Sequence, residues 1–180
     1  PAVQDCFATI AAITNSLRTP ARFGQRSATA LMKKRTWRIA GINFDHFHMG
    51  DLLRYAAEHP QVEIVGISDE QPARMEEAIR KGLVSRERAF ADYRECLEQT
   101  RPDVVILCPA ASQHGEWVKK VAPYGPHLMV EKPFAASLKE ADAMIKAMAP
   151  NQTLMINWPL QWVASHRKAY ELTADRKSVV

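Results

Sequence analysis

Glu131 and Lys132 are the residues best placed to do chemistry, because they directly follow the apolar run Leu-Met-Val at 128–130. A parallel strand buried on both faces is apolar throughout, so a charged pair at its end indicates that the end opens onto something polar. Pro133 has no backbone N–H for the next ladder hydrogen bond and ends the strand there. We therefore expect the end of this strand to border a polar site.

Small, polar or charged residues also follow four further apolar runs of the chain. They are Gly41 with Asn43, Asp69, Pro109 with Ala110, and Asn157. The carboxyl ends of parallel strands meet at one edge of a sheet, and ligands bind outside that edge. Five ends of this kind together predict a ligand site, whereas one end alone would predict little.

The turn after the first run has the sequence Gly-Ile-Asn-Phe-Asp-His at 41–46. In a dinucleotide-binding G-x-G-x-x-G turn, the pyrophosphate lies against the helix N-terminus that follows. Only the first glycine is present here. Asn43 tolerates a positive φ, but its side chain crowds the approach that a second glycine permits. We expect Gly41, Asn43, Phe44 and His46 to border the cofactor, although the turn alone does not identify a dinucleotide site.

Asp69 strengthens the dinucleotide interpretation. An acid at the end of the second strand can accept both ribose hydroxyls of an adenosine and repels a 2′-phosphate, so it favours NAD over NADP. The alternative is that Asp69 caps the helix that begins near Pro72. Both interpretations stay open at this point.

Apolar strand-like runs alternate with amphipathic helical segments along the chain. The expected strands are 38–42, 63–69, 88–92, 103–108, 127–130 and 153–157. The expected helices are 47–58, 72–81, one that includes Cys96 and Leu97, 112–124, 137–148 and 164–172. This alternation predicts an α/β fold with a doubly wound, mostly parallel sheet of the Rossmann type.

Composition excludes several other classes of protein. The 180 residues carry a net charge of only +4, which does not indicate a nucleic-acid surface. No apolar run approaches the roughly 20 residues of a membrane helix. The three cysteines are odd in number and lack C-x-x-C spacing, so we expect neither a disulfide framework nor a zinc site, and a cytoplasmic location.

The two ends of the chain differ from its middle. We expect residues 1–31 to be an extension, 32–159 to form the nucleotide-binding domain, and 160–174 to begin the connection to a further domain. Residues 175–180, Asp-Arg-Lys-Ser-Val-Val, resemble a translated sequencing adapter. On this interpretation the gene continues beyond Ala174, and the chain lacks a second α/β domain.

These motifs together resemble the glucose–fructose oxidoreductase/inositol dehydrogenase/MocA-like family. The residues that carry the resemblance are Gly41, Asp69, the run 103–108 with Pro109, His114, and Glu131-Lys132-Pro133. The resemblance spans about residues 38–170, and Glu-Lys-Pro is its most specific part. It implies an NAD(P)-dependent dehydrogenase acting on a sugar, cyclitol or related polyol, whose second domain shapes the substrate pocket and the homo-oligomer.

The resemblance also implies roles for particular residues. Lys132 would lie at the substrate hydroxyl near the nicotinamide and help to move its proton. Glu131 would contact the cofactor or orient Lys132, and Pro133 would fix the backbone after a bond that is often cis in the family. His114 either faces the nicotinamide ribose or is an exposed first-turn residue.

The sequence departs from the family at two points. Cys108-Pro109-Ala110 replaces the usual Thr-Pro-Asn, so Pro109 and Ala110 border the cofactor without the asparagine amide, and Cys108 reads as an inert buried thiol. The Asp and His that complete the family's catalytic set belong to the second domain. We therefore expect this chain to bind the cofactor without turning over.

Two other functions remain open. The degraded glycine turn favours a non-catalytic nucleotide-binding regulator or scaffold. A metal-dependent hydrolase would use His46 and His48. We expect no metal site, because Asp45 is read as a helix N-cap and the two imidazoles should then leave the helix on different sides.

Overall fold

The computed structural model describes residues 35–159 and 163–174. One compact unit comprises Thr36–Trp158, and helix α7 (Ala164–Ala174) belongs to a second unit. The expected extension at 1–31 and the expected tail at 175–180 lie outside the described residues. No helix within the described residues is long and apolar enough to cross a membrane.

The first unit is built on a six-stranded sheet whose strand order is β3-β2-β1-β4-β5-β6. All five neighbouring pairs are parallel. The strands are β1 (Trp37–Ile42), β2 (Val62–Ser68), β3 (Ala89–Phe90), β4 (Val104–Leu107), β5 (His127–Glu131) and β6 (Leu154–Asn157). The order reverses after β3, where the chain crosses to start β4 beside β1. The predicted doubly wound Rossmann fold is confirmed.

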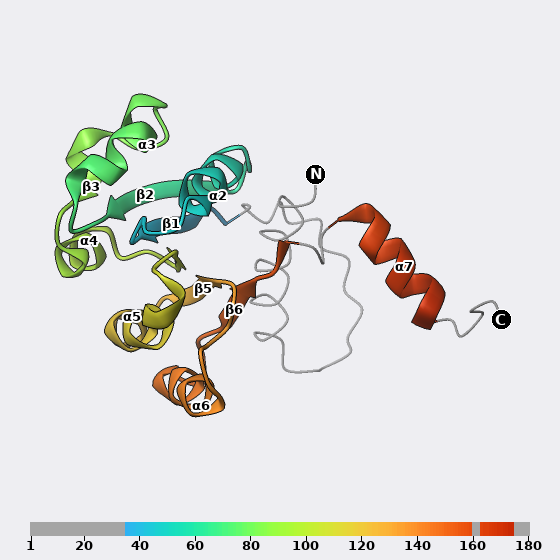
Figure 1. Cartoon of the computed structure of the whole chain (residues 1–180). Coiled ribbons are helices and arrows are strands. Elements are labelled where there is room, and N and C mark those ends of the chain that lie inside the picture. The colour runs from blue at the N-terminus through green and yellow to red at the C-terminus, as the bar shows by residue number, and fades with distance from the viewer. Residues whose placement is uncertain (1–34, 160–162, 175–180) are drawn as a thin grey trace, which may run out of the picture. The chain divides into compact units, whose positions relative to one another are not determined.

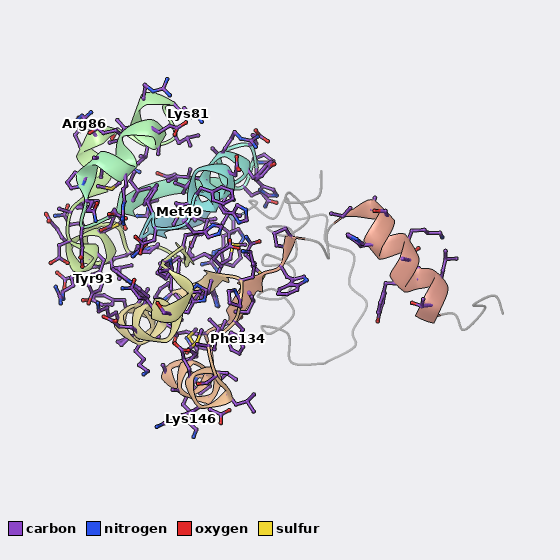
Figure 2. All side chains as sticks on the ribbon, viewed as in Figure 1. Met49, Lys81, Arg86, Tyr93, Phe134 and Lys146 are labelled. Carbon is purple, nitrogen blue, oxygen red and sulfur yellow. The ribbon has the colours of Figure 1, made fainter. Side chains whose placement is uncertain are left out.

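Helices cover both faces of this sheet (Figure 1). They are α2 (His48–Ala57), α3 (Glu76–Arg80), α4 (Tyr93–Thr100), α5 (His114–Val121) and α6 (Leu138–Ala147). Helices α2 and α3 lie on one face, and Met49 fills the space between α2 and β1 (Figure 2). Helices α4, α5 and α6 lie on the other face and bury one continuous apolar cluster against alternate residues of β1, β4 and β5.

The strand expected at 88–92 is much shorter than the sequence pattern predicted. Only Ala89 and Phe90 pair with β2. Asp92 ends the strand because its side chain accepts a 2.7 Å hydrogen bond from the Arg94 N–H and so caps α4. The helix expected at 72–81 likewise begins as a 3₁₀ turn, Pro72–Met75, before α3.

Helix α5 is held to α6 by one carboxylate. Glu140 accepts hydrogen bonds from the Ala136 N–H at 2.8 Å and from the Gly115 N–H at 3.1 Å. Ser137 completes the cap of α6 by accepting from the Glu140 N–H at 3.2 Å. Because Gly115 lies in the first turn of α5, this link fixes the end of α5 that faces the strand ends.

Gly66 in the middle of β2 allows α4 to lie close to the sheet. A methyl group at this position would lie 2.9 Å from Thr100 Cγ2 and 3.1 Å from Cys96 Sγ, both in α4. Gly50 in α2 is the opposite case, because a methyl group there would meet nothing within 4 Å. The two glycines form a matched pair for testing this packing.

Gly66→Ala should lower the free energy of unfolding by about 1–3 kcal/mol, because the added methyl overpacks the interface between α4 and β2. Gly50→Ala should raise it by about 0.5–1 kcal/mol, because alanine is the better helix former. Urea denaturation followed by circular dichroism measures both changes. Equal effects of the two substitutions would contradict the close packing of α4 on Gly66.

Candidate functional site

The predicted site residues gather where the parallel strands end. Ile42 of β1 lies opposite Ser68 of β2 and Leu107 of β4, so the residues that follow these three strands start at the same level. Val130 lies opposite Leu107, and Glu131 lies opposite Asn157. The register therefore brings together side chains that are far apart in the sequence.

Asp69 is buried at this edge, with 4% of its surface exposed. One carboxylate oxygen accepts the Phe44 N–H at 2.7 Å, and the other accepts the Gln71 N–H at 2.7 Å. The N-cap residue of the turn that starts at Pro72 is Gln71, so the prediction that Asp69 caps this turn is wrong. Asp69 instead joins the turn after β1 to the turn after β2, and its oxygens retain lone pairs for a ligand.

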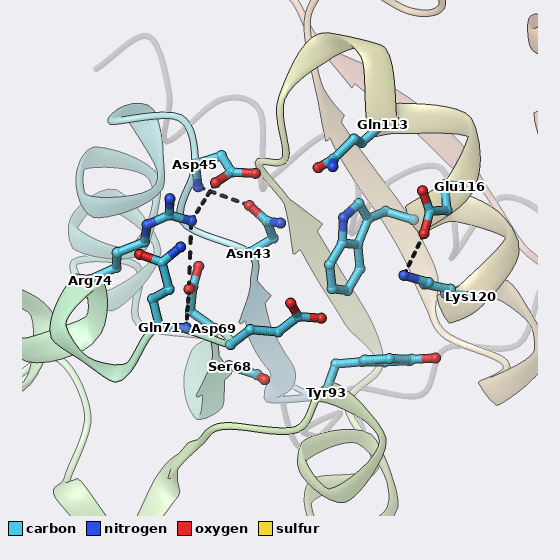
Figure 3. A pocket seen from close by; sticks show the side chains of 12 residues that line it. Asn43, Asp45, Ser68, Asp69, Gln71, Arg74, Tyr93, Gln113, Glu116 and Lys120 are labelled. Carbon is cyan, nitrogen blue, oxygen red and sulfur yellow. Dashed lines mark hydrogen bonds and ion pairs between the residues drawn. The ribbon is translucent and has the colours of Figure 1, made fainter.

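A cavity of about 280 Å³ opens beside Asp69 (Figure 3). Its charged lining consists of the acids Asp45, Asp69, Glu70 and Glu116 and the bases Arg74 and Lys120. Both bases are already paired, Arg74 with Asp45 and Lys120 with Glu116. Four acids against two bases leave a cavity wall with an excess of two negative charges, which disfavours an additional phosphate group.

In the turn after β1, where two glycines of the motif are missing, side-chain hydrogen bonds hold the backbone. Asn43 has φ 65° and accepts the Asp45 N–H at 2.8 Å through Oδ1. Asp45 does not cap α2 as predicted, because the N-cap residue is Phe47. Its carboxylate pairs with Arg74 and accepts the Ala110 N–H at 3.3 Å, so it ties the turn to the end of β4.

Four backbone N–H groups of this turn donate to acceptors inside the protein. The donors are Asn43, Phe44, Asp45 and His46, and their acceptors are the Ser68 carbonyl, the Asp69 carboxylate, Asn43 Oδ1 and the Cys108 carbonyl. In a phosphate-binding turn, such N–H groups point at the anion. Their internal use reduces the number of donors left for a pyrophosphate.

Glu131 and Lys132 lie at the end of β5. Glu131 is 1% exposed, and its Oε2 accepts a 2.8 Å hydrogen bond from Asn157 Nδ2. Lys132 Nζ lies 4.0 Å from Glu131 Oε1, and 40% of its side chain is exposed. The bond between Lys132 and Pro133 is cis, as the family resemblance implied. A buried carboxylate therefore lies near the amine of a lysine whose side chain is partly exposed.

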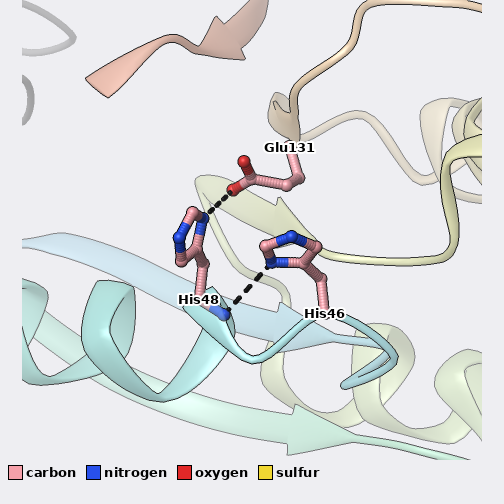
Figure 4. A group of neighbouring side chains, drawn as sticks. All are labelled: His46, His48 and Glu131. Atoms are coloured by element: carbon pink, nitrogen blue, oxygen red, sulfur yellow. Dashed lines mark hydrogen bonds and ion pairs between the residues drawn. The ribbon is translucent and has the colours of Figure 1, made fainter. Parts of the chain in front are cut away.

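His46 and His48 converge on Glu131, as Figure 4 shows. One ligand atom from each of the three residues lies within 4.8 Å of the others. The expectation that the two imidazoles diverge is wrong, because His46 precedes α2 and is not part of it. His48 Nδ1 lies 3.2 Å from Glu131 Oε2, although neither His48 Nδ1 nor Glu131 Oε1 makes a hydrogen bond.

The surroundings of His46 favour the neutral form of its imidazole. Burial is the largest cause and lowers its pKa below the ordinary value. The neighbouring Lys132, His48 and His114 act in the same direction, and the negative charge of Glu131 opposes them. A neutral imidazole can act as a hydrogen-bond acceptor or as a metal ligand.

The remaining predicted residues occupy different positions around this edge. His114 is the first residue of α5 and is 1% exposed, so the alternative of an exposed first-turn residue is wrong. Its Nδ1 has no hydrogen-bond partner. Pro109 is buried and Ala110 is exposed. Sequence reasoning did not single out Arg74 or Trp117 of the cavity, because neither belongs to a motif.

Comparisons with known proteins agree with this geometry. The sequence model of a family described as an oxidoreductase family with an NAD-binding Rossmann fold, Gfo/Idh/MocA, matches residues 21–157. Myo-inositol 2-dehydrogenase of Thermotoga maritima is 31% identical over 110 residues, which cover 61% of this chain and 29% of that protein. Glycosyl hydrolase family 109 protein 1 of Akkermansia muciniphila is 34% identical over 85 residues, covering 43% of this chain and 18% of that protein.

Solved structures show the same fold. Apo scyllo-inositol dehydrogenase from Lactobacillus casei superposes with a TM-score of 0.71 at 17% identity and covers 81% of this chain and 44% of that one. The 3-ketoreductase KijD10 of Actinomadura kijaniata, in complex with TDP-benzene and NADP, gives a TM-score of 0.69 at 19% identity over 78% of this chain and 44% of that one. The chain thus spans less than half the length of these similar proteins.

Cys96 and Cys108 should be unreactive toward a thiol reagent in the folded protein. Burial raises the pKa of Cys96 to about 12 and also raises that of Cys108, so neither forms the reactive thiolate near neutral pH. The measurement is a thiol titration at about pH 8 of a Cys6→Ser variant, native and in guanidinium chloride. We expect reaction only after unfolding, and rapid reaction of the native protein would contradict the described burial.

Proposed function

The chain belongs to the Gfo/Idh/MocA family of oxidoreductases with an NAD-binding Rossmann fold, and on this premise we propose that it supplies the cofactor site of an NAD-dependent dehydrogenase. The parent enzyme moves hydride between NAD and a sugar, cyclitol or related polyol. In this proposal residues 32–159 form the nucleotide-binding domain, and this domain by itself binds the cofactor without turnover.

The buried Asp69 carboxylate at the wall of the cavity is the single observation that carries this proposal. It offers acceptors to the two ribose hydroxyls at the end of the second strand, where dinucleotide-binding domains place such an acid. The excess of negative charge in the cavity wall supports NAD over NADP, because a 2′-phosphate would meet Asp69 and Glu70 there.

Lys132 is the proposed catalytic residue. Its side chain is partly exposed and its amine lies 4.0 Å from Glu131 Oε1, so in this proposal it holds a substrate hydroxyl and exchanges a proton with it. NAD, when bound, supplies the hydride acceptor, and the protein orients it. The residues proposed to border NAD are Gly41, Asn43, Phe44, His46, Asp69, Pro109, Ala110, His114, Glu131 and Pro133.

The substrate class rests on the similar proteins. Two curated relatives are named as inositol 2-dehydrogenases, and inositol is a cyclitol. We propose that the full-length protein that includes this chain acts on the same class of substrate. A homo-oligomer formed through a second domain and a cytoplasmic location belong to the same proposal.

A second function is favoured by the turn after β1. Four of its backbone N–H groups are used inside the protein, so the pyrophosphate of a dinucleotide would meet few free donors. A regulator or scaffold that keeps the fold and binds a nucleotide weakly accounts for this arrangement. Cofactor affinity therefore distinguishes the two functions.

Asp69→Asn should reduce the preference for NADH over NADPH by about tenfold or more, because it removes the charge that repels the 2′-phosphate while keeping one acceptor oxygen. The measurement is energy transfer from Trp117, which lines the cavity, to each reduced cofactor. Asp92→Asn is the matched control, because it removes an exposed acid from a cap that asparagine also satisfies.

Two results would contradict this account. An unchanged cofactor preference in Asp69→Asn would remove the ribose role and leave Asp69 as a link between two turns. No binding of either cofactor by a folded chain would favour the regulator. Circular dichroism of each variant separates loss of binding from loss of fold.

Lys132→Met should change the affinity of this chain for NADH by less than about twofold, because the amine is proposed to contact the substrate and not the cofactor. In the full-length protein, the same substitution should lower kcat by about 100- to 10,000-fold, the range that a general acid or base supplies. Steady-state kinetics with an inositol substrate provide the measurement. Unchanged kcat would exclude Lys132 from proton transfer.

A further inference from the structure

We propose that His46, His48 and Glu131 form a binding site for a divalent transition-metal ion, with Zn²⁺ as the best match. The site lies between the turn after β1 and the end of β5. Binding of the ion does not require hydride transfer. His46 and Glu131 are also among the residues proposed to border NAD, so the site is tested in the absence of cofactor.

The distances among the three side chains support this site. A ligand atom of each residue lies within 4.8 Å of the others, and the His46 and His48 rings are 4.4 Å apart between centroids. Zinc binds imidazole nitrogen at about 2.0–2.1 Å and carboxylate oxygen at about 2.0–2.2 Å, so any two ligand atoms of a tetrahedral site lie about 3–3.5 Å apart. The cluster therefore needs only small side-chain rotations to enclose an ion.

The hydrogen bonding of Glu131 also points to a missing partner. Glu131 is 1% exposed, yet its Oε1 makes no hydrogen bond, and the charge paired with this oxygen, Lys132 Nζ, lies 4.0 Å away. A buried carboxylate oxygen without a partner is costly, and buried charges are normally paired or bound to metal. His48 Nδ1 is also without a hydrogen bond, although it lies 3.2 Å from the same carboxylate. One ion between them would satisfy both groups.

The surrounding residues already orient the ligands. Asn157 Nδ2 donates to Glu131 Oε2 at 2.8 Å and fixes the plane of the carboxylate. Such outer-shell hydrogen bonds are typical of metal-binding carboxylates. His46 accepts a 3.2 Å hydrogen bond from the His48 N–H through Nδ1, so binding an ion at that nitrogen would cost this one bond.

The ligand set favours zinc over harder ions. Two imidazoles and one carboxylate suit Zn²⁺, whereas Mg²⁺ and Ca²⁺ prefer oxygen ligands alone. Three protein ligands leave a fourth position open for water or for an oxygen of a small molecule. Lys132 Nζ lies 4.0 Å from Glu131 Oε1, so its ammonium competes with the ion for the carboxylate.

The test is calorimetric titration of the metal-free full chain with Zn²⁺, together with visible absorption of the Co²⁺ form. No cofactor is present, so the result is separate from the NADH titrations. A Cys6→Ser background removes a thiol that could bind zinc. We expect one ion per chain and a Co²⁺ spectrum of nitrogen and oxygen ligands.

His46→Ala, His48→Ala and Glu131→Gln should each weaken Zn²⁺ binding by more than about 100-fold, because even outer-shell partners are worth 10- to 100-fold. His59→Ala is the matched control, because His59 lies outside the cluster, and it should change nothing. Lys132→Met should tighten binding by about tenfold or more, because it removes the competing charge beside Glu131.

The proposal is overturned if the folded chain binds no ion, or if His48→Ala with unchanged circular dichroism binds Zn²⁺ as tightly as the unsubstituted chain. Equal losses in His59→Ala and His48→Ala would show non-specific binding by surface imidazoles and would also overturn it. Glu131→Gln removes a buried charge and is interpreted only together with the two histidine variants.

Discussion

The shared direction of the six strands is the constraint on which the site depends. β1 satisfies its backbone groups through β2 on one side and β4 on the other, so its carboxyl end cannot shift without breaking two ladders. The turns after these strands must then meet at one edge. Asp69 and Glu131 become neighbours of the same turn for this reason, although 62 positions separate them in the sequence.

The turn after β1 keeps its place in the fold although two glycines of the G-x-G-x-x-G motif are absent. Asn43 adopts the positive φ that a glycine would take, and its side chain satisfies the Asp45 N–H. Asp45 brings a negative charge to the edge, and Arg74 neutralises it. Each replacement satisfies a local need of the backbone. Together they use the N–H groups that a phosphate would otherwise receive.

Much of the fold was predictable from local patterns. The apolar run before Cys108 predicted β4, and the apolar run that ends in Glu-Lys-Pro predicted β5. Both predictions were possible because a strand buried on both faces is apolar throughout. The convergence of His46 and His48 on Glu131 was not predictable, because it depends on where α2 begins and on the register of distant strands. The burial of His114 was missed for a related reason, since the first turn of a helix is exposed only when nothing packs over it.

Affinity and specificity for a dinucleotide are decided by different parts of this edge. The acid-lined cavity beside Asp69 distinguishes a ribose hydroxyl from a phosphate, and it depends on side chains that the fold holds in place. The strength of binding depends on N–H donors in the turn after β1, most of which are used internally. Substitutions in that turn can therefore change how tightly a nucleotide binds without changing which nucleotide is preferred. His46, which stands at the third glycine position of the motif, lies close to His48 and Glu131, so the turn that would hold a pyrophosphate also borders the proposed metal site.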